Sequence, residues 1–405
     1  MITVLIFALT IAAMILLAGR VPEWLCATAG ALAVICLRLD TTESAWRAIA
    51  TQWDVLLFFA GLALVTAAAE EAGVFEWITF RAALWGGGSS RRLLGAVLAV
   101  SAVTTILLTN DAAALVIAPL VAVMVRRLAL PPLPFVLCIA FIANAASAIL
   151  PISNPTNFIV ANGAGMNLPR YLRAVELPAL LALCVALLVL WFLFARPRTE
   201  RYRTDVLNAP KAPHWAALAT LAATAGGMIL ASAFSRPVGV VAFAGAGALL
   251  AVLNITGSSM RRALVRSHSS IVVLVASLFV IVDGLRSTGA LVMPVQWLSG
   301  LSAPMIAAIM SLLANVFNNL PVSMLVIQVL HHNSMHSAAT ASVAAGSIVG
   351  LAIGPNLTTI GSLSTILMLI VLRSRGIVIG VKDFMLPGLA VSAATIGVAV
   401  AALLL

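Results

Sequence analysis

Apolar stretches of membrane-spanning length recur along the whole sequence, and short polar segments separate them. An α-helix rises about 1.5 Å per residue, so about 20 apolar residues cross a hydrocarbon layer about 30 Å thick. We therefore predict an all-α polytopic membrane protein with about ten transmembrane helices, two of them interrupted. The predicted spans are 2–18, 22–38, 53–72, 134–168 (interrupted), 173–195, 214–233, 238–255, 269–285, 338–372 (interrupted) and 383–404.

Two further apolar segments, 93–125 and 303–330, are each broken in the middle by polar residues. The first break is Thr-Asn-Asp at 109–111, and the second is Asn-Asn-Leu-Pro at 318–321. Each segment is too long for one simple crossing, so we predict two re-entrant hairpins, each of which enters and leaves the bilayer by the same face. The segment 74–92 is rich in aromatic residues and predicts an interfacial helix that leads into the first hairpin.

Composition places nearly the whole chain in the membrane. Of the 405 residues, 62% are hydrophobic and 9% are charged, and the mean hydropathy is +1.14, beyond the range of ordinary soluble domains. The net charge of +10 comes from Lys and Arg in short loops between the apolar stretches. Such residues set membrane topology, so the positive charge does not indicate nucleic-acid binding.

The basic loops predict an orientation and a domain organisation. If the first hairpin is re-entrant, the basic loops fall on one side of the membrane, which the positive-inside rule makes cytoplasmic. Residues 1–195 then form a first inverted repeat, with hairpin 93–125 opening to the cytoplasm. Residues 196–213 form a cytoplasmic linker, and residues 214–405 form the second repeat, with hairpin 303–330 opening to the outside. Weak internal similarity, such as Asn110 with Asn318, supports this division.

Four polar breaks at membrane depth define the candidate substrate site. Non-helical backbone is tolerated there only when it is buried in protein or lines a wet cavity, so the breaks should face one another or a solute. Asn, Ser and Thr favour helix N-caps, and the positive end of a half-helix attracts an electron-rich oxygen. The candidate substrate-binding residues are Asn110, Asp111, Ser153, Asn154, Asn157, Asn318, Asn319, Asn356, Thr358 and Thr359.

Asp111 is the one acidic residue in the four breaks, and its counterpart in the second hairpin is Asn319. A carboxylate at this depth can bind a proton or a cation reversibly, which predicts a role for Asp111 in proton coupling. The alternative is a helix cap that stays ionised. Asp283 lies one turn before Arg286, which predicts an intrahelical ion pair.

The breaks carry a resemblance to a known family. The sequences at 107–115 (LLTNDAAAL), 141–147 (FIANAAS), 150–157 (LPISNPTN) and 354–363 (GPNLTTIGSL) resemble those of arsenite efflux permeases of the ArsB type, in the ion transporter superfamily. The resemblance implies a multi-pass protein of the inner (cytoplasmic) membrane. It also implies export of arsenite and antimonite, by exchange for protons or with a cytoplasmic arsenite-stimulated ATPase. This chain has no phosphate-binding Gly-x4-Gly-Lys-[Ser/Thr] sequence of its own.

The chemistry of arsenite narrows the kind of site expected. Arsenic(III) seeks thiolates, but the four cysteines, at 26, 36, 138 and 184, are scattered and lie outside the breaks, so we expect no thiolate metal site and no cofactor. Arsenous acid at neutral pH is an uncharged triol. It matches the donors and acceptors of Asn, Ser and Thr side chains.

Two alternatives remain besides arsenite export. The same fold suits a sodium-coupled anion carrier or a sodium/proton antiporter. An intramembrane enzyme is disfavoured because Asp111 has no acidic partner in the breaks, and because the histidines at 268, 331, 332 and 336 fall in predicted loops. The predicted partners are the solute, protons, the lipid bilayer and the ATPase just mentioned; the sequence leaves open whether the protein is a monomer or a homodimer.

Overall fold

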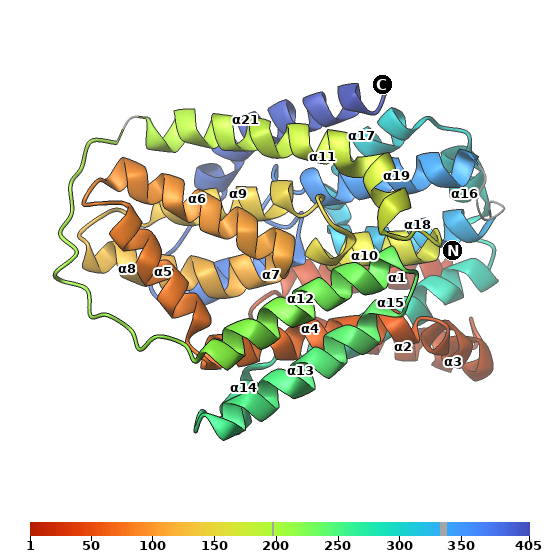
Figure 1. The fold of residues 1–405 in the computed structure, drawn as a ribbon. Helices are drawn as coiled ribbons and strands as arrows, with labels where there is room; N and C mark the ends of the chain where they lie inside the picture. The colour runs from red at the N-terminus through yellow and green to blue at the C-terminus, as the bar shows by residue number, and fades with distance from the viewer. Residues whose placement is uncertain (197, 333–337) are drawn as a thin grey trace.

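The computed structural model describes residues 1–196, 198–332 and 338–405, and this part of the chain is almost entirely helical. Helices make up two layers, and no β-strand occurs among the described residues (Figure 1). The prediction of an all-α polytopic membrane protein is confirmed.

The first layer, here called the scaffold layer, contains the helices drawn in red and green in Figure 1. It consists of α1 (Ile2–Leu16), α2 (Glu23–Cys36), α3 (Thr42–Ala50), α4 (Trp53–Glu71), α12 (Trp215–Ala233), α13 (Val238–Ile255), α14 (Met260–Arg266) and α15 (Ser270–Ser287). Helices α4 and α13 approach closely at Gly61, where an added Cβ would lie 2.5 Å from the backbone carbon of Ala242. Small residues thus let two apolar helices pack tightly where lipid gives no hydrophobic driving force.

The second layer, here called the broken-helix layer, holds both hairpins and both interrupted helices. Its first part consists of α5 (Val74–Trp85), α6 (Ser90–Leu107), α7 (Asn110–Ala112), the π-helix η1 (Ala113–Ile117), α8 (Ala118–Arg127), α9 (Leu133–Ala146), the 3-10 helix η2 (Pro151–Ser153), α10 (Pro155–Gly163), α11 (Leu168–Leu190) and the π-helix η3 (Trp191–Ala195). Its second part consists of α16 (Val292–Ser299), α17 (Ala303–Phe317), α18 (Asn319–His332), α19 (Ala338–Ile353), α20 (Leu363–Ser374) and α21 (Val381–Ala402).

Apolar packing joins the two layers near the breaks. The ring of Phe158, in α10, lies 4.2 Å from the ring of Phe58, in α4, measured between centroids. Leu320 and Leu363, which follow the breaks in the second half of the chain, belong to the same buried cluster as Phe58. The breaks are therefore held against the scaffold layer by side chains immediately beside them.

Seven helical stretches among the described residues are long and apolar enough to cross a membrane by themselves. They are Trp53–Glu71, Ser90–Leu107, Leu168–Ala195, Trp215–Ala233, Val238–Ile255, Met260–Ser287 and Val381–Ala402. The predicted spans 2–18 and 22–38 form shorter helices. The two predicted interrupted spans each divide into two short helices at their polar breaks, and so do not appear as single long ones.

Several local boundaries differ from the prediction. The interfacial helix predicted over 74–92 ends at Trp85, because three glycines follow it, and α6 begins at Ser90 instead. The amphipathic helix α3 and the short helices α14 and α16 were not predicted. Of the histidines assigned to an outer loop, His331 and His332 belong to the end of α18; their side chains and His336 lie outside the described residues.

Two buried or half-buried ion pairs fasten helix ends in the scaffold layer. Asp283 accepts a hydrogen bond from the Arg286 side chain at 2.7 Å, which confirms the predicted intrahelical pair, and another from the hydroxyl of Ser44 in α3 at 2.6 Å. Glu71, at the end of α4, pairs with Arg262 of α14 at 2.7 Å. Asp283 and Glu71 therefore each bond to a side chain on a neighbouring helix, Ser44 of α3 and Arg262 of α14.

The segment between the two halves is attached to the broken-helix layer over its first part. The hydroxyl of Ser90 donates to the carboxylate of Glu200 at 2.8 Å, and the hydroxyl of Tyr202 donates to the carbonyl of Ala83 at 2.6 Å. The pKa of Glu200 is lowered, first of all by a hydrogen bond from its own backbone N–H. The hydrogen bond from Ser90 and the positive charge of Arg198 lower this pKa further. Figure 1 shows this segment at one end of the molecule and both chain termini at the other.

Candidate solute-binding site

The first hairpin breaks where α6 ends and the short α7 begins. Thr109 lies between them in an extended conformation, and its hydroxyl oxygen accepts a hydrogen bond from the backbone N–H of Ala112 at 3.1 Å. This is the N-cap role that threonine favours, so α7 begins at Asn110 with Asp111 in its first turn. The π-helix η1 follows directly, and π turns within helices are frequent at functional sites. The cap therefore fixes where Asn110 and Asp111 project.

The break between α9 and α10 is held by its own side chains. The Asn154 carboxamide oxygen accepts hydrogen bonds from the backbone N–H of Thr156 at 3.0 Å and from its hydroxyl at 2.9 Å. The Asn154 amide group donates to the hydroxyl oxygen of Ser147 at 3.1 Å. Ser153 donates to the carbonyl of Ile106 at 2.8 Å, and so ties this break to the first hairpin.

The second hairpin turns at a single residue with positive φ. Asn318 has φ of 69° and ψ of 144°, which lies outside the αL region and is strained for a residue with a Cβ. Its amide group donates to the carbonyl of Ile360 at 2.9 Å, and its side-chain oxygen accepts from the backbone N–H of Leu320 at 3.2 Å. The backbone N–H of Asn319 donates to the carbonyl of Gly361 at 3.0 Å. The tip is thus bonded directly to the break between α19 and α20.

Two asparagines outside the tips hold the last break in place. The amide group of Asn315, in α17, donates to the carbonyl of Gly354 at 2.8 Å, and its side-chain oxygen accepts from the backbone N–H of Thr358 at 2.9 Å. Asn144, in α9, donates to the side-chain oxygen of Asn356 at 2.9 Å. Unpaired backbone at this depth is costly, and these carboxamides replace the helical bonds that the break gives up.

A small cavity of about 20 Å³ lies where the breaks meet. Its polar lining comes from both tips and from the starts of α10 and α20, and consists of Asn110, Asp111, Asn154, Thr156, Asn319, Ser362 and Ser364. Phe59 and Ile271 of the scaffold layer form part of its apolar lining. A cavity needs about 10–15 Å³ to hold one water molecule, so this one accepts only a very small polar group without rearrangement.

Two buried polar atoms at this cavity lack a protein partner. Within the part of the chain that the structure describes, the side-chain oxygens of Asn110 and Ser362 make no hydrogen bond, although both residues are about 99% buried. Leaving a buried polar atom unpaired costs about 1–3 kcal/mol, so such atoms usually serve a ligand or a water molecule. Both residues line the small cavity, and their two side-chain oxygens have no bond within the described protein.

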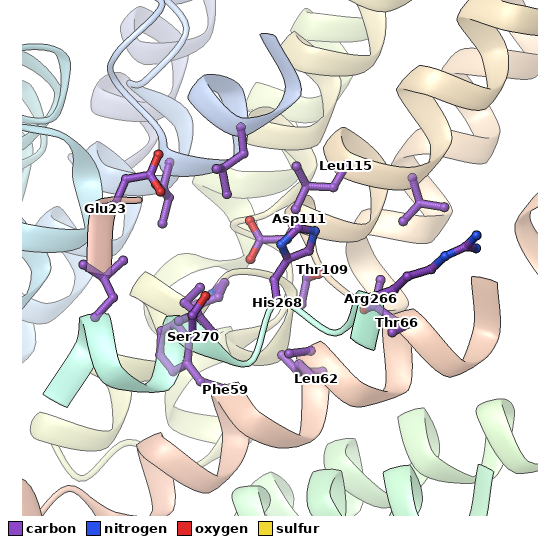
Figure 2. A pocket seen from close by; sticks show the side chains of 18 of the residues that line it. Glu23, Phe59, Leu62, Thr66, Thr109, Asp111, Leu115, Arg266, His268 and Ser270 are labelled. Carbon is purple, nitrogen blue, oxygen red and sulfur yellow. The ribbon is translucent and has the colours of Figure 1, made fainter. Parts of the chain in front are cut away.

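A larger cavity of about 130 Å³ adjoins the small one, and Asp111 lines both. The Ser364 hydroxyl donates a hydrogen bond to one oxygen of the Asp111 carboxylate. Figure 2 shows Asp111, Thr109 and His268 around the middle of the larger cavity, with Glu23 and Arg266 on opposite sides. Asp111 is thus the ionisable side chain at the junction of the two spaces.

The structure brings some of the candidate site residues together and uses others elsewhere. Those at the small cavity are Asn110, Asp111, Asn154 and Asn319. Five other candidate residues bond to neighbouring backbone or side chains and line neither cavity: Ser153, Asn157, Asn318, Asn356 and Thr358. Thr359 is half-buried in the same break and also lies outside both linings.

Sequence analysis missed several residues at the site. Ser362 ends the last break and Ser364 lies in the first turn of the helix after it, and two serines at the start of a half-helix were a signal that could have found them. Asn315 lies one turn before the second tip, so an asparagine at helical spacing from a break was a second signal. His268 lies on a loop, and nothing in its local sequence indicates that the loop borders the cavity.

The cysteines do not gather at the breaks. The free thiols lie on three helices, Cys26 and Cys36 on α2, Cys138 on α9 and Cys184 on α11, and they line neither cavity. Among the described residues there is no group of three or more His, Cys, Asp or Glu side chains placed to hold a metal ion. The donors that the site does offer are carboxamides, hydroxyls and one carboxylate.

Broken helices that meet at a small polar cavity within a multi-pass helical bundle define the class of the protein: it is a membrane transporter. The chain belongs to the citrate transporter family (CitMHS), whose model matches residues 11–350. Membership excludes an enzyme, and the family does not by itself fix the solute.

Individual relatives are similar over most of their length. An arsenical pump membrane protein of Escherichia coli is 28% identical over 380 residues, which cover 87% of this chain and 86% of the relative. The protein of the same name from Yersinia enterocolitica is 27% identical, covering 94% and 93%. An uncharacterized transporter of Mycobacterium tuberculosis is 26% identical, covering 96% and 95%.

Proposed function

We propose that this transporter exports arsenite and antimonite in exchange for protons, and that a central site is exposed to each side of the membrane in turn. The observation that carries the proposal is the pair of unpaired oxygens, on Asn110 and Ser362, at one small cavity. Arsenous acid, a neutral triol, donates to the carboxamide oxygen of Asn110 and exchanges donor and acceptor roles with the hydroxyl of Ser362. The relatives named as arsenical pumps support the same solute.

The size and charge of the small cavity favour this solute over citrate. Its volume is about 20 Å³, and none of the described residues that line it is Lys or Arg. A tricarboxylate carries several charges that must be paired when they leave water, and carboxamides and hydroxyls pair them poorly. A small uncharged triol needs hydrogen bonds alone.

Proton coupling is assigned to Asp111. The ionised carboxylate accepts hydrogen bonds from the solute, whereas the protonated form has lost part of that capacity. Proton binding and solute binding at Asp111 therefore oppose each other, as exchange in opposite directions requires. Ser364 holds one carboxylate oxygen, which leaves the other for the solute or the proton.

The proposal includes an orientation and a repeat. The end of the molecule that carries the inter-half segment is placed in the cytoplasm, because α14 and the ends of α8 and α20 bring their arginines to that end (Figure 1). Residues 1–195 and 214–405 are proposed as the inverted repeats, 196–213 as the cytoplasmic linker, and the inner membrane as the location. Hairpin 93–125 then opens to the cytoplasm and hairpin 303–330 to the outside.

In this orientation the structure faces inward. The larger cavity is lined by residues at the cytoplasmic ends of α2, α4 and α14, namely Glu23, Glu70 and Arg266, and it reaches Asp111 at depth. Release to the other side then requires the broken-helix layer to move against the scaffold layer. A cytoplasmic ATPase is a candidate partner on this same face.

The second candidate is a sodium-coupled carboxylate carrier. The family match and the basic side chains of Arg266 and His268 in the larger cavity favour it. Everted membrane vesicles separate the two functions, since their cytoplasmic face meets the medium. We expect arsenite uptake that is driven by an acidic lumen, abolished by a protonophore and indifferent to sodium. Citrate movement that requires sodium, without arsenite uptake, selects the second candidate.

A pair of serine variants tests the small cavity itself. Ser362→Ala removes the hydroxyl at the cavity, and we expect the KM for arsenite to rise about fivefold, which corresponds to one hydrogen bond of about 1 kcal/mol. Ser347→Ala is the matched control, because Ser347 is also fully buried with an unpaired hydroxyl but lies in α19 away from the cavity. Equal effects of the two variants on KM contradict the assignment.

A further inference from the structure

A histidine that the fold brings from the scaffold layer lies at the larger cavity. His268 is in the loop between α14 and α15, and its carbonyl accepts a hydrogen bond from the N–H of Ile271 at 3.0 Å, where α15 begins. In Figure 2 its imidazole lies beside the Asp111 carboxylate. Both side chains line the same cavity and are near enough for their charges to interact.

The two groups differ in their access to water. Asp111 is partly exposed, at the junction of the small and larger cavities, whereas His268 is exposed on the wall of the larger one. A proton that leaves Asp111 toward the cytoplasm passes this wall. Histidine is the side chain that most often transfers protons in proteins.

The other charged groups around the larger cavity are accounted for. Arg266, from α14, lies 3.9 Å from Glu70 and 3.9 Å from Glu71 of α4, so these charges balance one another at the mouth. Glu23 belongs to the start of α2, on the far side of the cavity in Figure 2. In Figure 2, Glu23 and Arg266 lie farther from Asp111 than His268 does.

We propose that His268 is a proton-relay residue that carries protons between Asp111 and cytoplasmic water. The inference rests on the proposed function, and it adds a positioning residue from the opposite layer. During export, the carboxylic acid of Asp111 gives its proton to a ring nitrogen of neutral His268, which leaves a carboxylate and an imidazolium. The imidazolium then gives a proton to water in the cavity and returns to the neutral ring.

The relay predicts a kinetic separation in everted vesicles. Exchange of labelled arsenite for unlabelled arsenite at equal pH needs no proton release, whereas uptake driven by an acidic lumen does. His268→Ala should slow driven uptake about tenfold, flatten its dependence on the pH of the medium, and leave exchange unchanged. Imidazole added to the medium, which meets the cytoplasmic face, should restore driven uptake.

Controls separate failure of the relay from failure of the proposed function. His214→Asn, at the N-cap of α12, changes another histidine on the same face while keeping a side chain that caps the helix, and it should behave as wild type. Wild-type driven uptake in His268→Ala, equal loss of exchange and driven uptake, or slow uptake that imidazole does not restore each overturns the relay alone. A wild-type protein that moves no arsenite, or Asp111→Asn that keeps proton-driven uptake, overturns the proposed function and the relay with it.

Discussion

The two hairpin tips use their polar side chains in opposite ways. At the second tip, the Asn318 amide group bonds the carbonyl of Ile360, and the Asn319 amide group approaches the carbonyl of Leu351 at 3.4 Å. At the first tip, Asn110 keeps an unpaired oxygen and Asp111 faces two cavities, with Ser364 on one of its oxygens. The second tip holds the neighbouring break together, while the first presents free groups.

This difference teaches that similar breaks do not imply similar chemistry. A broken helix first has to satisfy its own backbone, and carboxamides do so because each carries both N–H donors and an acceptor oxygen. Groups remaining after that requirement is met are the ones available to a solute. By this criterion the first tip, with Ser362 of the last break, carries the binding chemistry that we propose.

The largest expected effect is at the first tip. Asp111→Asn keeps the size and an acceptor for Ser364 but cannot carry a proton, so proton-driven arsenite uptake in everted vesicles should fall about 100-fold or more. Asp205→Asn, at an exposed acid of the linker, is the control and should change nothing. Driven uptake within a fewfold of wild type for Asp111→Asn would remove the proposed distinction between the tips.

The helix that leads into the second tip should instead respond in stability. Asn315→Ala leaves the carbonyl of Gly354 and the N–H of Thr358 without their partner, at a cost of about 1–3 kcal/mol each. We expect a clearly lower midpoint of thermal unfolding in detergent. Asn254→Ala, at an exposed asparagine of α13, should lower stability by less than about 0.5 kcal/mol. Comparable midpoints for the two variants would contradict the structural role.

A smaller effect is expected at the partner of Asp111. Ser364→Ala removes the hydroxyl that donates to the carboxylate, and water in the adjoining cavity replaces part of that bond. We expect driven uptake to fall about threefold to tenfold. The free energy that corresponds to this loss is smaller than the 1.5–3 kcal/mol typical of a hydrogen bond to a charged group. Ser364→Thr, which retains a hydroxyl, should keep most of the activity. A loss as large as that of Asp111→Asn is the outcome that would contradict this ranking.

The smallest effect concerns an acid away from both tips. Asp40 follows α2 and lies outside the spanning segments. Burial raises the pKa of its carboxyl group, and the nearby Asp283 carboxylate raises it further, whereas a hydrogen bond from the backbone N–H of Thr41 lowers it. A group whose pKa is higher in the folded state than in the unfolded state stabilises the fold at pH values below its unfolded pKa. This stabilisation is lost as the pH rises through the folded-state pKa.

The matching variant is Asp40→Asn, which does not titrate. Its midpoint of thermal unfolding should match that of wild type in acid and exceed it slightly at neutral pH, measured across a pH series in detergent. A difference that is largest in acid would reverse the sign and contradict the assignment. Arsenite uptake should be unaffected, which separates a buried acid of the scaffold layer from Asp111.

The sequence predicted the places where helices break better than the roles of the residues there. Asn accompanied by Thr, Ser, Asp, Pro or Gly within apolar stretches located all four breaks, because helix capping and the loss of helical bonds are local effects. Whether Asn356 faces a solute or bonds Asn144 depends on which helix packs beside it, and that is a tertiary contact. His268 comes from a loop whose position relative to Asp111 is set by the packing of two layers.

The attachment of the linker has a consequence for how far the first hairpin can travel. Because Glu200 is bonded to Ser90 and Tyr202 to Ala83, the start of the linker moves with α5 and α6. The free length is then the segment 203–214, about a dozen residues, before α12 begins in the other layer. A fully extended chain covers about 3.3–3.6 Å per residue, so this tether reaches at most about 40 Å, and less wherever it bends. Shortening this segment residue by residue would measure how far the two layers move relative to each other during the transport cycle.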